Sequence, residues 1–172
     1  MRFKIFGVLA TAALLSACAS GSEDKGTTSG AGSAATAKPA VSAAATSAIA
    51  PGSQEDLVAN VGDRVFFGYD KYALNDKSRA VLDKQAAWLN ANPSVRIIVQ
   101  GHCDERGTRE YNLALGERRA NSVKDYLVQL GLNPSRVRTI SYGKERPVAV
   151  GSTEASWAQN RRSVTVVAGA GS

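Results

Sequence analysis

Residues 95–119 read VRIIVQGHCDERGTREYNLALGERR, and this stretch contains two elements with a polar turn between them. Apolar residues alternate with others over residues 95–99, as expected for a half-buried strand. Residues 101–110 are densely polar, and from Glu110 onward apolar side chains recur at helical spacing as far as Leu130. The stretch therefore predicts a strand, a polar loop and an amphipathic helix in succession.

The flanking sequence predicts further strands and helices by the same criteria. We expect a strand over residues 61–67, where Val61, Asp63, Val65 and Phe67 share one face. Further along we expect a helix capped by Asn75 or Asp76 and running to about Ala91, strands over residues 137–142 and 164–167, and a short helix around Trp157.

This order of elements predicts an α/β fold, more specifically an α+β two-layer sandwich. Strands joined through helices favour right-handed crossovers and parallel neighbours. The last strand follows too short a connection for a full crossover, so we expect it to pair antiparallel. The result is a mixed sheet of about four strands with two main helices on one face.

The N-terminal residues 1–17 have the pattern of a bacterial signal peptide. Arg2 and Lys4 precede an apolar run, which is too short for a permanent membrane span. Residues 15–18, LSAC, resemble the lipobox of lipoprotein signal peptides, which implies cleavage before Cys18 and acylation of that residue. A plain secretory signal followed by a coincidental cysteine is the alternative. Ala19 after the cysteine, in place of aspartate, favours the outer membrane.

Composition divides the rest of the chain. Residues 18–53 comprise the cysteine and an Ala/Ser/Gly/Thr-rich run without aromatic residues, which predicts a disordered tether. Residues 54–168 are expected to form the one folded domain, and residues 169–172 a short tail. The formal charge of +6 falls to about +4 without residues 1–17, and acidic and basic residues are interleaved in the domain. We therefore expect no nucleic-acid partner.

Three enzyme classes use residue types that are present in the polar loop. His102 and Cys103 are adjacent, so on a strand they point to opposite faces, which argues against a nucleophile–base pair. The consecutive spacing also argues against a zinc site, and no cofactor is expected. A hydrolase using Asp104 and Glu105 is not excluded by spacing, although no second motif supports it. Cys103 continues the buried strand face and is predicted to be a small core residue.

Several separated motifs of the domain resemble those of OmpA-like peptidoglycan-binding domains, in particular the lipoprotein members that work with the Tol system. The resemblance covers residues 60–168, and many members have serine at the position of Gly116. The motifs that carry it are FFGYD at residues 66–70, GHCDERGT at 101–108, Asn112 and Leu115, GERRA at 116–120, SYGKERP at 141–147 and NRR at 160–162.

The resemblance implies a ligand, meso-diaminopimelate in the stem peptides of peptidoglycan. It assigns Asp104 to the ammonium group of the ligand and Arg119 to a carboxylate, which its planar guanidinium suits. Main-chain N–H groups of residues 105–110 are expected to bind further carboxylate oxygens. The other expected ligand-binding residues are Phe67, Asp70, Thr108 and Asn112.

Two alternatives concern individual residues of this site. Asp104 and Arg119 can instead form a structural ion pair that closes the loop on the helix. Residues 160–162 either support the site or only cap the last strand.

The resemblance also implies a non-enzymatic function in the cell envelope. It predicts an outer-membrane lipoprotein on the periplasmic side that tethers the membrane to peptidoglycan, with a role in envelope integrity and in outer-membrane invagination during division. Other Tol-system proteins, above all the propeller domain of TolB, are the expected protein partners. The alternative function is an adaptor whose main ligand is such a periplasmic protein.

Overall fold

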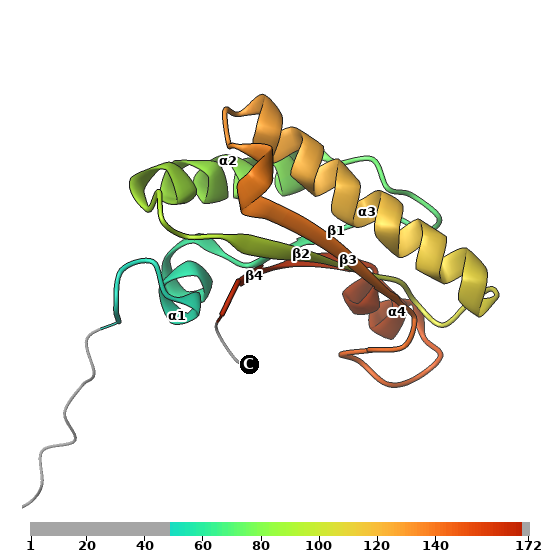
Figure 1. The fold of residues 1–172 in the computed structure, drawn as a ribbon. Helices are drawn as coiled ribbons and strands as arrows, with labels where there is room; N and C mark the ends of the chain where they lie inside the picture. Colours follow the sequence, from blue (N-terminus) through green and yellow to red (C-terminus); the bar gives the residue numbers. More distant parts are fainter. Residues whose placement is uncertain (1–48, 170–172) are drawn as a thin grey trace, which may run out of the picture. The chain divides into compact units, whose positions relative to one another are not determined.

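The computed structural model describes residues 49–169 (Figure 1). Two short helical turns, α1 (Gln54–Asp56) and the π-helical turn η1 (Leu57–Val61), come first. The other elements are β1 (Arg64–Phe66), α2 (Asp76–Ala91), β2 (Ile97–His102), α3 (Arg109–Gln129), the 3₁₀ turn η2 (Pro134–Arg136), β3 (Val137–Gly143), α4 (Glu154–Asn160) and β4 (Arg162–Val167). The signal peptide, Cys18 and the tether as far as residue 48 lie outside the described residues, as do residues 170–172.

The four strands form one mixed sheet in the order β1-β4-β2-β3. β2 and β3 are parallel, whereas β4 is antiparallel to both of its neighbours, β1 and β2. The expected antiparallel last strand is therefore confirmed. The expectation that the first two strands are neighbours is wrong, because β4 inserts between β1 and β2.

The sheet and the two long helices form the two predicted layers. Helices α2 and α3 cover one face of the sheet, and the short α1 and α4 lie on its other side (Figure 1). The core between the layers is made of fully buried aliphatic side chains, principally Leu82, Leu89, Ile97, Val99, Val123 and Leu127. The α/β two-layer fold expected from the sequence is confirmed.

The first strand is shorter than its sequence pattern predicted. Asp63, Val65 and Phe67 are all buried, as the alternation required. Val61, however, ends the π-helical turn, whose last bond runs from the Gly62 N–H to the Leu57 carbonyl. Gly62 has φ +95°, a conformation that glycine adopts without strain, so the chain changes direction there and the strand begins only afterwards.

Helix α3 packs directly on β2 through two glycines. A Cβ atom at Gly101 would collide with the carbonyl oxygen of Gly116, and one at Gly116 would collide with Oγ of Ser141. The position where many members of the resembling family have serine therefore has no room for a side chain here. This close approach brings the N-terminal end of α3 to the end of β2, where the polar loop lies.

Candidate functional site

A cavity of about 160 Å³ lies where β2 ends and α3 begins. It gathers four of the six ligand-binding residues expected in the domain: Asp70, Asp104, Asn112 and Arg119. Phe67 and Thr108 do not line it. The remaining lining residues are Tyr69, Arg106, Gly107, Tyr111 and Leu115.

Arg119 is buried in the third turn of α3 and binds main-chain carbonyl groups. Its Nη1 donates to the His102 carbonyl over 2.8 Å, its Nε to Lys71 over 2.8 Å and its Nη2 to Gly68 over 3.1 Å. Only 1% of the residue is exposed. Because a guanidinium has five N–H groups, at most two remain for a ligand. Arg119 thus joins the β1–α2 connection and the end of β2 to α3.

Phe67 packs against the guanidinium group of Arg119. Its ring lies 5.2 Å from the guanidinium carbon of Arg119, within the range of a cation–π contact. Phe67 is 4% exposed and packs against Arg119, and it does not line the cavity.

Asp104 is a buried carboxylate that two arginines neutralise. Arg106 approaches it with Nη2 at 2.6 Å from Oδ2, and Arg161 with Nη1 at 3.5 Å from the same oxygen. Burial opposes ionisation of Asp104, but the hydrogen bonds and charges of Arg106 and Arg161 outweigh it, so the pKa lies below its usual value. Arg119 forms no ion pair with Asp104 in the described part of the chain, so the alternative of a structural pair between these two residues is wrong.

Asp70 also lines the cavity. It is the one non-glycine residue of the described range with positive φ, at +52°, and its carboxylate accepts a hydrogen bond from the Tyr111 hydroxyl. That bond raises the pKa of the tyrosine and joins the β1–α2 connection to the first turn of α3.

Thr108 and Asn112 shape the loop. Thr108 is the N-cap of α3, because its hydroxyl accepts from the Tyr111 N–H over 3.2 Å. The amide of Asn112 donates to the Arg106 carbonyl over 2.7 Å and to the Thr108 carbonyl over 3.0 Å. Of the main-chain N–H groups expected to face a ligand, that of Arg106 is already bonded to Asp104.

Residues 160–162 contact both the site and the start of the last strand. Arg161 supports the site, since it contacts Asp104 and donates to the Phe67 carbonyl over 3.1 Å. Asn160 instead holds residues 148–149 through three hydrogen bonds. Arg162 donates to the carbonyls of Asn160 and Arg146 at the start of β4.

The sequence assigned no role to Arg106 and did not indicate its aromatic neighbours. The guanidinium carbon of Arg106 lies 4.0 Å from the ring centre of Tyr69 and 4.0 Å from that of Trp157. These rings come from the β1–α2 connection and from α4, so no local pattern around Arg106 indicates the contact.

His102 and Cys103 lack the properties of a nucleophile and its base. Burial, reinforced by the charges of Arg162 and Arg146, lowers the pKa of His102 to about 4. Burial raises the pKa of the Cys103 thiol to about 11, so the thiol stays protonated at neutral pH. Cys103 is 3% exposed, which confirms it as a core residue.

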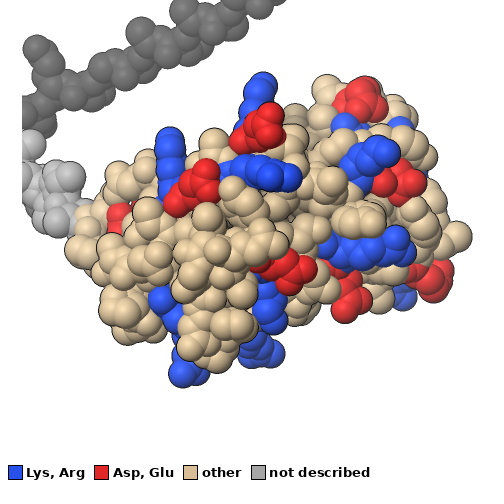
Figure 2. Space-filling model, turned by 90° about the horizontal axis from the view of Figure 1, so that it is seen from above, with Lys and Arg blue, Asp and Glu red and all other residues tan. Residues whose placement is uncertain are grey.

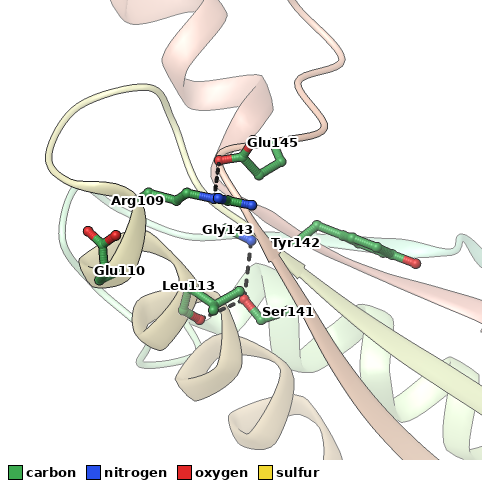
Figure 3. A pocket seen from close by; sticks show the side chains of 7 residues that line it. All are labelled: Arg109, Glu110, Leu113, Ser141, Tyr142, Gly143 and Glu145. Atoms are coloured by element: carbon green, nitrogen blue, oxygen red, sulfur yellow. Dashed lines mark hydrogen bonds and ion pairs between the residues drawn. The ribbon is translucent and has the colours of Figure 1, made fainter.

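A second and larger hollow, of about 430 Å³, lies on the other side of the α3 N-terminus, against β3 (Figure 3). Its mouth holds the ion pair of Arg109 and Glu145, with Nε 3.3 Å from Oε1. Its floor includes Leu113 and Ser141, whose hydroxyl donates to the Leu113 carbonyl. None of the six residues whose side chains were predicted to bind the ligand lines this hollow.

The molecular surface over the helices carries charges of both signs. Figure 2 shows lysine and arginine side chains interleaved with acidic ones over this face. Within residues 49–169, no helix has the length and apolar character needed to cross a membrane.

The fold and the cavity together define a small α/β ligand-binding domain. Residues 66–161 match the OmpA family, and the chain belongs to that family. A peptidoglycan-associated lipoprotein of Rhizobium meliloti is 57% identical over 125 residues, which cover 73% of this chain and 71% of that protein. The protein of the same name from Haemophilus influenzae is 48% identical over 100 residues, covering 58% and 65% of the two chains.

Solved structures agree with this assignment. The peptidoglycan-associated lipoprotein of Burkholderia pseudomallei superposes with a TM-score of 0.60 at 47% identity, over 61% of this chain and 89% of that one. The C-terminal domain of Helicobacter pylori MotB has the same fold, with a TM-score of 0.57 at 24% identity over 61% and 83%. These relatives place the chain in a non-enzymatic family, as the sequence predicted.

Proposed function

We propose that this protein is an outer-membrane lipoprotein, anchored through Cys18, whose domain binds peptidoglycan non-covalently through meso-diaminopimelate. In this role it tethers the outer membrane to the cell wall as part of the Tol system and contributes to envelope integrity and to membrane invagination during division. The observation that carries the proposal is the cavity in which a carboxylate, Asp104, and a guanidinium, Arg119, face the same space.

The chemistry of this cavity suits an amino acid with both charges. Asp104 and Asp70 offer carboxylates to an ammonium group. The N–H groups that Arg119 does not use for main-chain carbonyls offer donors to a carboxylate. Meso-diaminopimelate presents ammonium and carboxylate groups on one short chain, so a small cavity with both kinds of partner matches it. The names of the relatives support peptidoglycan as the source of this group.

Binding to purified sacculi tests the proposal. Full-length protein in detergent is expected to co-sediment with diaminopimelate-containing sacculi, and Asp104→Asn is expected to weaken binding tenfold or more, since a charged hydrogen bond contributes about 1.5–3 kcal/mol. Asp125→Asn is the matched control, because Asp125 is an exposed carboxylate of α3 that does not line the cavity. Equal loss in both variants, or unchanged binding of Asp104→Asn, contradicts the proposed site.

A second candidate function is binding of a periplasmic protein such as TolB. Exposed tyrosines favour it: Tyr69 and Tyr111 stand at the cavity with 61% and 45% exposure, and Tyr72 lies nearby in sequence with 47%. Such side chains are enriched in protein interfaces. Parallel pull-downs on sacculi and on periplasmic extract separate the two functions, since only the adaptor function predicts that extract proteins are retained while sacculi are not.

A further inference from the structure

Arg106 hydrogen-bonds to both carboxylate oxygens of Asp104. Its Nη2 lies 2.6 Å from Oδ2 of Asp104, while its Nε and its main-chain N–H both donate to Oδ1, over 3.2 and 3.1 Å. Both oxygens of the carboxylate are therefore already bonded to a cation of the protein itself. The ammonium group of a ligand therefore competes with this guanidinium for the same carboxylate oxygens.

An aromatic pair holds Arg106 in this position. The ring centres of Tyr69 and Trp157 each lie 4.0 Å from its guanidinium carbon, close enough for cation–π attraction. Trp157 is fixed in turn, because its indole N–H donates to Oε1 of Glu105 over 2.9 Å. Three segments of the chain, namely the β1–α2 connection, the polar loop and α4, thus meet at this one side chain.

The exposure of this arrangement allows Arg106 to move away from Asp104. The side chain of Arg106 is 28% exposed and Tyr69 is 61% exposed, so the arrangement opens directly to solvent. A second carboxylate lies near Arg106, since Oε2 of Glu154 is 4.0 Å from its Nη1. Arg161, whose side chain is only 8% exposed, stays beside Asp104 and is held by the Phe67 carbonyl. Asp104 therefore keeps one cationic neighbour when Arg106 moves.

We propose that Arg106 is a specificity-determining residue that occupies, in the free protein, the place of the cationic group of the ligand, and that a ligand ammonium binds Asp104 by displacing it. The inference rests on the proposed function, because it concerns the same site. A ligand without a cation cannot replace the guanidinium, so Arg106 selects for ligands that carry one. Displacement separates Arg106 from Trp157, which makes the indole a reporter of the exchange.

Fluorescence and calorimetry together test the inference. Trp88→Phe leaves Trp157 as the one tryptophan of the chain, and the probe is the disaccharide tetrapeptide that contains meso-diaminopimelate. We expect the Trp157 emission of the full-length protein to change with the same midpoint as the calorimetric binding curve. Calorimetric binding with unchanged emission overturns the inference but leaves the proposed function standing. The absence of calorimetric binding overturns the proposed function, and the inference falls with it.

Two variants test the competition from different sides. Arg106→Met removes the competing cation at similar length, and Trp157→Leu loosens it while leaving the charge in place. Both are expected to tighten binding of the probe by about threefold to tenfold. Arg109→Met, which changes a neighbouring exposed arginine in the other hollow, is the control and is expected to leave binding unchanged.

Melting temperatures measured on the same samples show whether each variant is folded. Weaker binding by a folded Arg106→Met overturns the inference, because it identifies Arg106 as a direct ligand contact. Unchanged binding by a folded Trp157→Leu overturns the role of the aromatic pair.

Discussion

Arg119 is the residue on which fold and site depend together. Arg119→Ala would leave the carbonyls of His102, Lys71 and Gly68 without their donor in a buried setting. We expect the free energy of unfolding to fall by about 3 kcal/mol or more, measured by urea denaturation. Arg119→Lys is expected to recover only part of this loss, because an ammonium lacks the planar fork that reaches three carbonyls. Full stability of the alanine variant would contradict this structural role.

His102 gives the domain a specific dependence of stability on pH. Its pKa is about 4 in the folded protein, below the ordinary value of 6.5 that applies when the chain is unfolded. Between these values the unfolded chain binds more protons, so stability is complete above about pH 6.5 and declines as the pH falls toward 4. At about 1.4 kcal/mol per unit of pKa, the loss is at most about 3.5 kcal/mol.

Thermal melts of wild type and His102→Phe between pH 7 and 4.5 check this dependence. The variant keeps an aromatic ring against Tyr142, whose ring centre lies 5.5 Å from that of His102, but does not titrate. We expect a flatter pH profile for the variant over this window. Parallel profiles for the two proteins would show that another group is responsible.

The sequence predicted the position of some site residues but not the contacts of others. Asp104, Asn112 and Arg119 belong to one continuous loop-and-helix pattern, so their assembly at one cavity could be anticipated. The occupation of Asp104 by Arg106 could not, because it depends on Tyr69 and Trp157, which long-range folding brings together. The engagement of Arg119 by three carbonyls was equally invisible, since main-chain positions carry no sequence signal.

At the scale of elements, the contact between β2 and α3 fixes the geometry of the site. Gly101→Ala would force its Cβ against the Gly116 carbonyl and push the strand and helix apart. We expect a loss of at least about 2 kcal/mol in unfolding free energy. Gly68→Ala is the control, because its Cβ would meet only the flexible Lys71 side chain, at 3.4 Å. Equal stability of the two variants would contradict the close packing.

Local sequence patterns placed the elements well and their neighbours less well. The capping by Asn75, whose side chain accepts from the Ser78 N–H over 2.8 Å, and the turn at Gly131 with φ +93° follow directly from residue type. The insertion of β4 between β1 and β2 depends on pairing across the whole domain, so the order of elements along the chain did not reveal it.

For the whole molecule, the proposed tethering of the outer membrane to the cell wall depends on a lipid anchor at Cys18. The residue lies outside the described range, and its assignment comes from the LSAC motif at residues 15–18. Cys18→Ser is expected to give an uncleaved or unlipidated protein that leaves the outer-membrane fraction, because lipid chains contribute about 0.8 kcal/mol per buried methylene. Membrane fractionation and mass spectrometry provide the measurement. A substituted protein that is still cleaved and still firmly membrane-bound would contradict the anchor.

The central claim is recognition of meso-diaminopimelate by the charged cavity at the end of β2. Its most direct test compares binding of the wild-type protein to two kinds of wall, one with meso-diaminopimelate and one with lysine at the same stem position. Lysine keeps the ammonium but lacks the additional carboxylate, so Arg119 loses a partner. We expect the lysine-type wall to bind at least tenfold more weakly. Equal binding to both walls would contradict carboxylate recognition in this cavity.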